Sequence, residues 1–183
     1  MGLSPFGLAV WAVATLPAGE LVCGGASGFS VNGGVYRWTG GTSWVPVGAP
    51  PRGRVYALLS LPNGDLVAGG ELGAVGGVPT LGIGRWNGAS WSAFDHGVNA
   101  EVWALEALPN GDIVAGGNFT GASGMLASGI ARWNGTSWSA LGAGVHGEVW
   151  CLAVFPNGDL VAGGQFDAAG GIPARNIARW DGS

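Results

Sequence analysis

The chain has 183 residues and a net charge of −4; 48% of its residues are hydrophobic and 10% are charged. This composition is typical of a packed globular protein and excludes a disordered one. All seven basic residues are Arg, too few for the basic stripe that a nucleic-acid partner requires. The 38 glycines follow no three-residue period, which excludes collagen and indicates many tight turns in a β protein.

The first apolar run, MGLSPFGLAVWAVATLPAG, has the apolar centre of a signal peptide but lacks its positively charged start. Its VWAVATLPAGELVCGG aligns with VWALEALPNGDIVAGG from Val102, so we interpret it as a structural strand and expect no signal peptide in this chain. No apolar run is long enough to span a membrane, and no membrane partner is expected.

One ten-residue phrase occurs four times: LPAGELVCGG from Leu16, LPNGDLVAGG from Leu61, LPNGDIVAGG from Leu108 and FPNGDLVAGG from Phe155. The starts are 45, 47 and 47 residues apart. A fixed period in this range predicts a repeat architecture, in which each unit buries its faces only against its neighbours.

The third repeat shows the predicted elements in order. VWALEAL, from Val102, is predicted as a strand buried on both faces, and Pro109-Asn110-Gly111 as a three-residue hairpin turn with a bulge. DIVAGG is a second strand whose glycine pair indicates a bulge or a close backbone approach. GIARW is a third strand, and Asn134-Gly135 provides a two-residue turn into the fourth, TSWSAL.

Each repeat is therefore a four-stranded antiparallel meander. Residues 1–183 are predicted to form one all-β domain, a β-propeller of four-stranded blades with four repeats of about 47 residues. The first strands are expected to start near Val10, Val55, Val102 and Val149. A linear stack of sheets is the alternative, and ring closure is favoured because it leaves no exposed sheet at either end.

Several features resemble the kelch-type propeller repeat: four hydrophobic residues before Gly-Gly, an aromatic residue on the third strand and a Trp on the fourth. The aromatic pairs are Trp38 and Trp44, Trp86 and Trp91, and Trp133 and Trp138. Trp replaces the usual Tyr, and the spacing is six in the first repeat but five in the next two. PNGDLVAGG…IARWNG is also similar to repeats of large bacterial surface and secreted proteins, a resemblance that implies a secreted or cell-surface location.

The chain begins and ends in the middle of a repeat. Joining Ser183 to Met1 regenerates the fourth repeat except for a Ser-Trp-Ser segment, so residues 1–7 are predicted to be the closing outer strand of the last blade, without its Trp. Two explanations stay open. The sequence is a segment of a longer array, or two chains form one eight-bladed ring as a homo-oligomer.

An acid opens every second strand and an Arg precedes every third-strand Trp. The predicted cross-strand pairs are Glu20 with Arg37, Asp65 with Arg85, Asp112 with Arg132, and Asp159 with Arg179. Because the pair recurs in all repeats, it is interpreted as structural. The two cysteines, Cys23 and Cys151, stand where the other repeats have Ala and are expected to be small buried groups.

The repeats differ at the end of the blades where the first strands begin, which we call the variable end; the Pro-Asn-Gly turns form the opposite turn end. The predicted ligand-binding residues at the variable end are Arg54, Asp95, His96, Glu101, His146 and Glu148. Phe119 and Phe166 are the exposed aromatic residues expected there.

No metal-ligand pattern, nucleophile elbow or dinucleotide motif is present, so no metal, no cofactor and no enzymatic activity are expected. The predicted function is a non-catalytic scaffold or protein-interaction module. A carbohydrate-binding, lectin-like propeller is the alternative. The predicted partners are a protein or a glycan of unknown identity and a second copy of the chain.

Overall fold

The computed structural model describes residues 9–26, 33–41, 43–49 and 51–182, which contain β-strands and no helix. All strand pairs among them are antiparallel, which confirms the all-β prediction. The chain divides into two compact units, Met1–Phe94 and Asp95–Ser183. The closing strand predicted for residues 1–7 lies outside the described residues.

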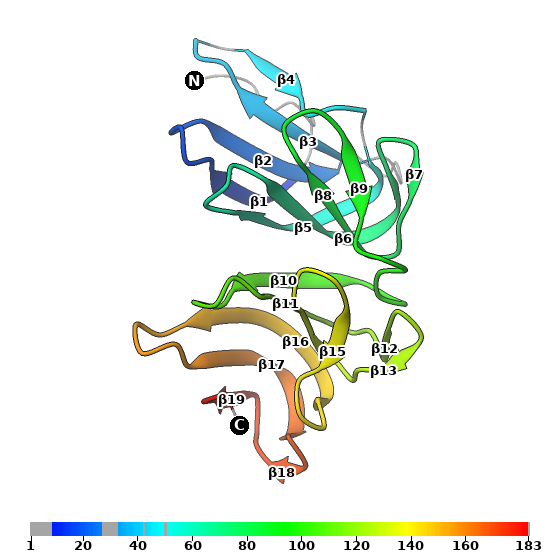
Figure 1. The fold of residues 1–183 in the computed structure, drawn as a ribbon, viewed down its shortest axis with the longest axis vertical. Coiled ribbons are helices and arrows are strands. Elements are labelled where there is room, and N and C mark those ends of the chain that lie inside the picture. Colours follow the sequence, from blue (N-terminus) through cyan, green and yellow to red (C-terminus); the bar gives the residue numbers. More distant parts are fainter. Residues whose placement is uncertain (1–8, 27–32, 42, 50, 183) are drawn as a thin grey trace. The chain divides into compact units, whose positions relative to one another are not determined.

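Unit 1 contains two sheets (Figure 1). The first has the order β1-β2-β3-β4, and the second has the order β5-β6-β8-β9 with β7 paired to β6. The strands are β1 (Ala9–Thr15), β2 (Leu21–Ala26), β3 (Gly33–Trp38), β4 (Trp44–Pro46), β5 (Arg52–Ser60), β6 (Leu66–Val75), β7 (Val78–Pro79), β8 (Ile83–Trp86) and β9 (Trp91–Ala93).

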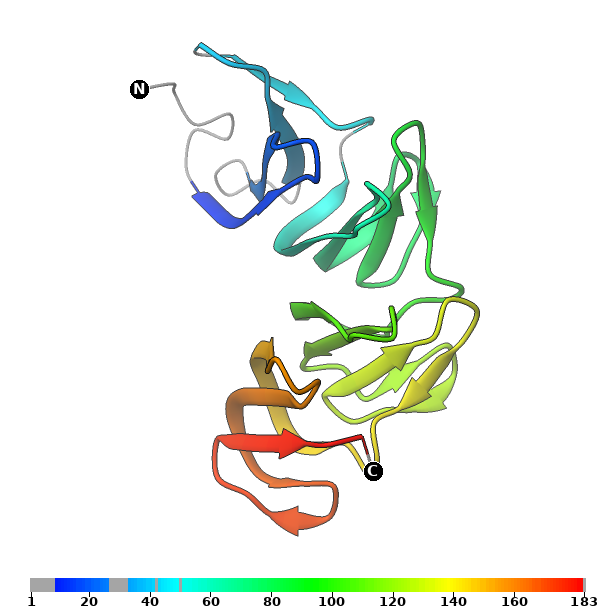
Figure 2. The same cartoon turned by 60° about the vertical axis from the view of Figure 1, so that its left-hand side comes forward.

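Unit 2 repeats this plan with one difference at its end (Figures 1 and 2). The third sheet has the order β10-β11-β14-β15 with a small β12-β13 ribbon beside it, and in the last sheet β17 pairs with β16, β18 and β19. The strands are β10 (Val102–Ala107), β11 (Ile113–Gly117), β12 (Gly121–Ala122), β13 (Met125–Leu126), β14 (Ile130–Trp133), β15 (Trp138–Ala140), β16 (Val145–Val154), β17 (Leu160–Ala169), β18 (Ile172–Pro173) and β19 (Ile177–Trp180).

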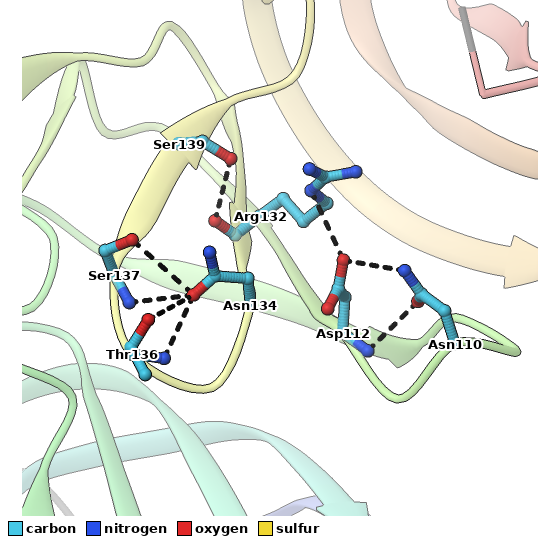
Figure 3. Close-up of polar contacts among 7 residues, drawn as sticks. All are labelled: Asn110, Asp112, Arg132, Asn134, Thr136, Ser137 and Ser139. Carbon is cyan, nitrogen blue, oxygen red and sulfur yellow. Dashed lines mark hydrogen bonds and ion pairs between the residues drawn. The ribbon is translucent and has the colours of Figure 1, made fainter.

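The predicted three-residue hairpin is confirmed at the Pro-Asn-Gly turns. The backbone N–H of Gly111 donates to the carbonyl of Leu108 at 2.9 Å, and Gly111 has φ 88°. Only glycine adopts such a φ without strain. The Asn does more than shape the backbone: Asn110 Nδ2 donates to Asp112 Oδ2 at 2.9 Å, and the Asp112 N–H donates to Asn110 Oδ1 at 3.1 Å (Figure 3).

The four predicted cross-strand ion pairs are confirmed. The joined atoms are Arg37 Nη1 and Glu20 Oε1 (3.0 Å), Arg85 Nε and Asp65 Oδ2 (2.6 Å), Arg132 Nε and Asp112 Oδ2 (3.4 Å), and Arg179 Nε and Asp159 Oδ2 (2.7 Å). Asn63 and Asn157 hold Asp65 and Asp159 as Asn110 holds Asp112. Asp65, Asp112 and Asp159 are therefore each held on one side by the turn Asn and on the other by the Arg of the third strand.

The second hairpin is capped by a side chain. Asn134 Oδ1 accepts the backbone N–H groups of Thr136 at 3.0 Å and Ser137 at 2.9 Å (Figure 3). The backbone N–H of Asn134 donates to the Ser137 carbonyl at 3.2 Å, so the two residues inside the turn are Gly135 and Thr136. The predicted two-residue turn is present, but it is shifted by one residue because the Asn forms an Asx turn.

The close backbone approach predicted at the glycine pair of the second strands is confirmed at the second glycine, and the first glycine also allows close packing. A Cβ on the second glycine would overlap a backbone carbonyl oxygen of the facing first strand. This oxygen belongs to the residue directly before the starting Val: at Gly70 it is the oxygen of Arg54, which precedes Val55. A Cβ on the first glycine would overlap the next sheet of the same unit: Gly24 faces Val55, and Gly116 faces Val149. The glycines therefore set both the strand pairing and the packing of sheet on sheet.

Each unit has one core between its two sheets. The buried residues of unit 1 include Val47, Leu66, Ala68, Leu72, Val75 and Trp91, and those of unit 2 include Leu141, Leu160, Ala162 and Phe166. Cys23 is buried as expected, but the same expectation for Cys151 is wrong, because its side chain is exposed. Cys151 lies on β16 in the last described sheet of unit 2.

Candidate binding site at the variable end

Each first strand has a bulge directly after its starting Val, and the residue at that bulge is aromatic. The pairing register shifts between Val10 and Ala12, Val55 and Ala57, Val102 and Ala104, and Val149 and Cys151. The residues between them are Trp11, Tyr56, Trp103 and Trp150. An extra residue in one strand bends it and re-aims the side chain. The facing glycine makes the bulge possible, because it leaves room for the displaced carbonyl.

These aromatic side chains are not core residues. Trp11 is 47% exposed and Trp150 is 51% exposed, while Tyr56 and Trp103 are half-buried. In unit 1 the rings of Trp11 and Tyr56 lie 5.2 Å apart at 57°. The prediction that the first strand is buried on both faces is therefore wrong for these positions. The available signal was the recurrence of an aromatic residue directly after the starting Val in all four repeats.

The aromatic residues expected to be exposed are instead buried. Phe119 is 1% exposed and Phe166 is 4% exposed, and Phe166 belongs to the core of unit 2. Their counterpart in the second repeat is Leu72, which is also a core residue. These phenylalanines follow the glycine pair and pack inward, so they are not the exposed aromatic surface that was expected.

Most of the predicted ligand-binding residues have cross-strand partners. Arg54 Nη1 lies 3.2 Å from Glu71 Oε2. The Glu101 N–H donates to Asn118 Oδ1 at 3.0 Å, and Asn118 Nδ2 donates to Glu101 Oε2 at 3.3 Å. Both pairs join the start of a first strand to the end of the neighbouring second strand. These residues therefore form a polar rim on each hairpin.

Asp95 and His96 form a separate local pair. His96 Nδ1 lies 2.9 Å from Asp95 Oδ1, and the His96 N–H donates to the Ser123 hydroxyl oxygen at 3.3 Å. The pKa of Asp95 is lowered, mainly by a hydrogen bond from the Ser123 side chain and further by His96, against a smaller opposing effect of desolvation. Asp95 is therefore ionised at neutral pH. Its partners are the adjacent His96 and Ser123, which lies between β12 and β13.

His146 and Glu148 lie on one strand, β16, beside the exposed Trp150. His146 Nδ1 lies 2.7 Å from Asp167 Oδ1 on β17, and Trp150 Nε1 donates to Glu148 Oε2 at 3.0 Å. Glu148 is paired in register with Gln165. Three of the features expected of a binding surface, an aromatic ring, a carboxylate and an imidazole, are thus brought to the same end of one hairpin.

A polar pocket of about 460 Å³ opens at this end of the last sheet. Its lining residues are His146, Gly147, Gln165, Phe166, Asp167, Arg175 and Asn176. Arg175 has Ser128 and Leu81 as its counterparts in the preceding repeats, and His146 has Asn99. The pocket therefore combines side chains that the other repeats lack. The sequence places both His146 and Arg175 in the variable loops at this end, but only the fold shows that they line one pocket.

Among the described residues, no group of three or more His, Cys, Asp or Glu side chains is placed to hold a metal ion. The same part of the chain contains no helix long and apolar enough to cross a membrane. The chemistry of the pocket is that of hydrogen bonding and charge, which suits recognition of a polar or charged ligand.

No protein-family model matches this chain. No curated protein matches it either. Solved structures do. The chain superposes on a virginiamycin B lyase from Staphylococcus aureus with a TM-score of 0.60 at 11% identity, covering 98% of this chain and 58% of that one. The chain has a β-propeller fold.

Two further structures agree with this fold. One is the extracellular domain of a B. thetaiotaomicron protein described as a hybrid two-component system, with a TM-score of 0.60, 15% identity, and coverage of 100% of this chain and 22% of that one. The other is YCF48 bound to D1 peptide, with a TM-score of 0.51, 18% identity, and coverage of 91% and 52%. The chain thus spans about three fifths or less of these structures, and at such identities the likeness shows the fold alone.

Proposed function

We propose that this protein is a non-catalytic, kelch-like β-propeller module that binds a segment of a partner protein at the variable end. The observation that carries the proposal is the exposed, bulged Trp150 on β16, the strand that also contributes His146 to the pocket with Asp167 and Arg175. An exposed indole supplies apolar contact area at low entropic cost, and Arg and Trp are the residues most often found in binding hot spots. The neighbouring carboxylates and amides supply directional hydrogen bonds.

The test compares the loss of peptide affinity caused by substitutions at the variable end with the loss caused by substitution of an exposed aromatic residue at the turn end. A display library of random twelve-residue peptides would be selected on the intact chain, and the selected peptides measured by biolayer interferometry. Trp150→Ala and Arg175→Ala should each weaken binding by about tenfold or more, which corresponds to about 1.4 kcal/mol. Phe155→Ala is the control, because Phe155 is 53% exposed at the turn end of the same strand pair. Binding lost in the control variant and kept in the other two would refute the site.

A carbohydrate ligand is the second candidate, and the exposure of Trp11 and Trp150 favours it. Sugar rings present apolar faces that stack on indoles, and their hydroxyls suit a pocket of Asp, Gln and Arg side chains. A glycan array probed with the labelled chain distinguishes the two. Glycan binding that Trp150→Ala abolishes, with no peptide selected at this end, would assign the site to a sugar instead.

The proposal includes a ring of four-stranded blades, in which the turn end and the variable end form the two faces. Two closures are compatible with it: residues 1–7 complete the last blade within one chain, or two chains form an eight-bladed homo-oligomer. The partial coverage of the larger solved propellers, 58% for the lyase, supports a ring of more than four blades. Light scattering decides between them, because the monomer mass is 18.2 kDa and the dimer mass is twice that.

A further inference from the structure

Asn-Gly pairs occur at two kinds of turn in the described part of the chain. Asn63, Asn110 and Asn157 lie between the first and second strands, and Asn87 and Asn134 lie between the third and fourth strands. Asparagine is a labile residue, because the backbone nitrogen of the next residue can attack its side-chain amide. Glycine has no side chain to hinder that nitrogen. The local sequence therefore makes all these pairs similarly labile, and their contacts decide which of them reacts.

The contacts at the Pro-Asn-Gly turns oppose this reaction. The attacking nitrogen is occupied, because the Gly111 N–H donates to the Leu108 carbonyl at 2.9 Å. The Asn110 amide is occupied as well, because its Nδ2 donates to Asp112 Oδ2 at 2.9 Å. Attack would place negative charge on Asn110 Oδ1 close to this carboxylate, and like charges repel. Gly64 and Gly158 make the same turn hydrogen bond, at 2.9 and 2.8 Å.

The contacts at Asn134 favour the reaction instead. Its Oδ1 accepts the backbone N–H groups of Thr136 at 3.0 Å and Ser137 at 2.9 Å, and also the Thr136 hydroxyl at 2.9 Å (Figure 3). Among the described residues, neither the Gly135 N–H nor Asn134 Nδ2 has a hydrogen-bond partner. Asn110 and Asn134 are both exposed, so access of water does not distinguish them.

We propose that Asn134 is a site of intramolecular deamidation, with the Gly135 nitrogen as the nucleophile and water as the only co-reactant. Hydroxide removes the Gly135 amide proton, and the nitrogen attacks Asn134 Cγ, closing a five-membered ring. Negative charge develops on Oδ1, where the Thr136 and Ser137 donors already point. Donors placed in advance at a developing oxyanion stabilise the transition state.

The remaining steps balance with water alone. The oxyanion intermediate collapses, the Cγ–Nδ2 bond breaks, and Nδ2 takes a proton from water and leaves as ammonia. The product is a cyclic imide. Water then adds to one of its two carbonyl carbons and breaks the bond from that carbon to the ring nitrogen. One choice gives Asp at this position, and the other gives isoaspartate, whose backbone runs through the former side chain.

The modification acts at the turn end of the third sheet, since Trp133 pairs with Ile113 beside the Pro-Asn-Gly turn. It is therefore independent of the ligand site proposed at the variable end. The Asp product adds a negative charge and is compatible with the fold, because the fourth repeat has Asp181 at the equivalent position. The isoaspartate product lengthens the backbone of the turn and should disturb the pairing of Trp133 with Trp138.

Asn87 provides an intermediate case. Its Oδ1 accepts the N–H groups of Ala89 at 3.0 Å and Ser90 at 2.9 Å, but Ala89 has no hydroxyl to add a third donor. The Gly88 N–H, like that of Gly135, has no partner among the described residues. The rate of deamidation should therefore be greatest at Asn134, lower at Asn87 and lowest at Asn110.

The test follows deamidation of the full chain at pH 8 and 37 °C, in native buffer and in guanidinium chloride. Peptide mass spectrometry with fragmentation measures the conversion of each Asn to Asp or isoaspartate. In the folded chain Asn134 should react about tenfold or more faster than Asn110, because donors at an oxyanion are worth at least this much. In guanidinium chloride the two rates should converge. Equal rates in the folded chain, or a ratio that unfolding leaves unchanged, would overturn the proposal.

Two variants of the same hairpin test the role of the donors. Thr136→Ala removes the hydroxyl but keeps the backbone donors, as Ala89 does in the second repeat. It should slow the reaction at Asn134 by about two- to tenfold, the value of one hydrogen bond. Ser139→Ala is the control, because the Ser139 hydroxyl donates to the Arg132 carbonyl at 3.3 Å instead (Figure 3). Its rate should equal that of the unchanged protein. Equal slowing in both variants would contradict the assignment.

Discussion

Arg85 donates from Nε to Asp65 Oδ2 at 2.6 Å across the β6–β8 pair. Asp65 is 7% exposed, and its carboxylate also accepts Asn63 Nδ2 at 3.0 Å. The same three residue types meet in the third and fourth repeats. In the first repeat, Ala18 stands in place of the Asn and Glu20 in place of the Asp, and the pair with Arg37 is more exposed. The ion pair thus recurs in every repeat, but the extent to which it is buried differs between repeats.

Removal of the Arg should have different effects in the two sheets of unit 1. Arg85→Ala leaves a buried carboxylate with one partner fewer and should lower the free energy of unfolding by about 1–3 kcal/mol. Arg37→Ala is the control. Its side chain and that of Glu20 are 43% and 41% exposed, and such pairs contribute about 0–1 kcal/mol. Urea denaturation measures both, and a larger loss for Arg37→Ala would show that burial does not set the strength of the pair.

Gly70→Ala should destabilise the second sheet. The added Cβ would overlap the Arg54 carbonyl oxygen at the bulge, and over-packing of this kind costs about 1–3 kcal/mol. Gly73→Ala, on the same strand, is the control, because a Cβ there meets no atom within 4 Å. Its effect should stay within about 0.5 kcal/mol, as for other surface substitutions. Equal stabilities of the two variants would mean that the bulge is not required.

Trp91 should be a main anchor of the core of unit 1. Trp91→Ala removes the buried ring and should lower the free energy of unfolding by about 3–5 kcal/mol. Trp91→Phe keeps an aromatic ring but leaves the Val47 carbonyl without its donor, and should lower it by about 1–3 kcal/mol. Thermal and urea unfolding of both variants provide the measurement. Trp91→Ala should lose more unfolding free energy than Trp91→Phe. Equal losses in the two variants would show that the hydrogen bond, and not the packing of the ring, accounts for the stabilisation.

The thiol of Cys23 should make stability fall at high pH. Burial raises the pKa of Cys23 to about 11 from its ordinary value of 9.0. Above pH 9 the unfolded chain loses this proton while the folded chain keeps it, so unfolding releases a proton and stability decreases as pH rises. The decrease is at most about 1.4 kcal/mol per pH unit between pH 9 and 11. Cys23→Ala, the residue that the other repeats have, should remove this part of the pH dependence. Identical pH profiles for both proteins would contradict it.

The same burial should protect Cys23 from alkylation. Cys151 is exposed and Cys23 is buried, so iodoacetamide at pH 8 should modify Cys151 in the folded chain and reach Cys23 only after unfolding. Peptide mass spectrometry identifies the modified residue. Rapid labelling of Cys23 under folding conditions would indicate that the first sheet opens readily.

The sequence alone was sufficient for the features that depend on local chemistry. The repeat, the Pro-Asn-Gly hairpins and the antiparallel meander follow from turn residues and strand-forming runs, which act within a few residues of one another. The pairing of Asp112 with Arg132 followed as well, because an antiparallel hairpin register brings the start of one strand beside the end of the other.

Only the tertiary structure determined which side chains face solvent. Trp150 lies at a one-residue bulge that shifts the alternation of its strand, and the bulge depends on the room left by a glycine on the facing strand. Phe166 is buried because its face of β17 packs into the core of unit 2. The pocket at His146 and Arg175 likewise joins segments that are almost thirty residues apart and differ from the other repeats. Periodicity shows which residues repeat, but the contacts between strands and between sheets decide what each of them touches.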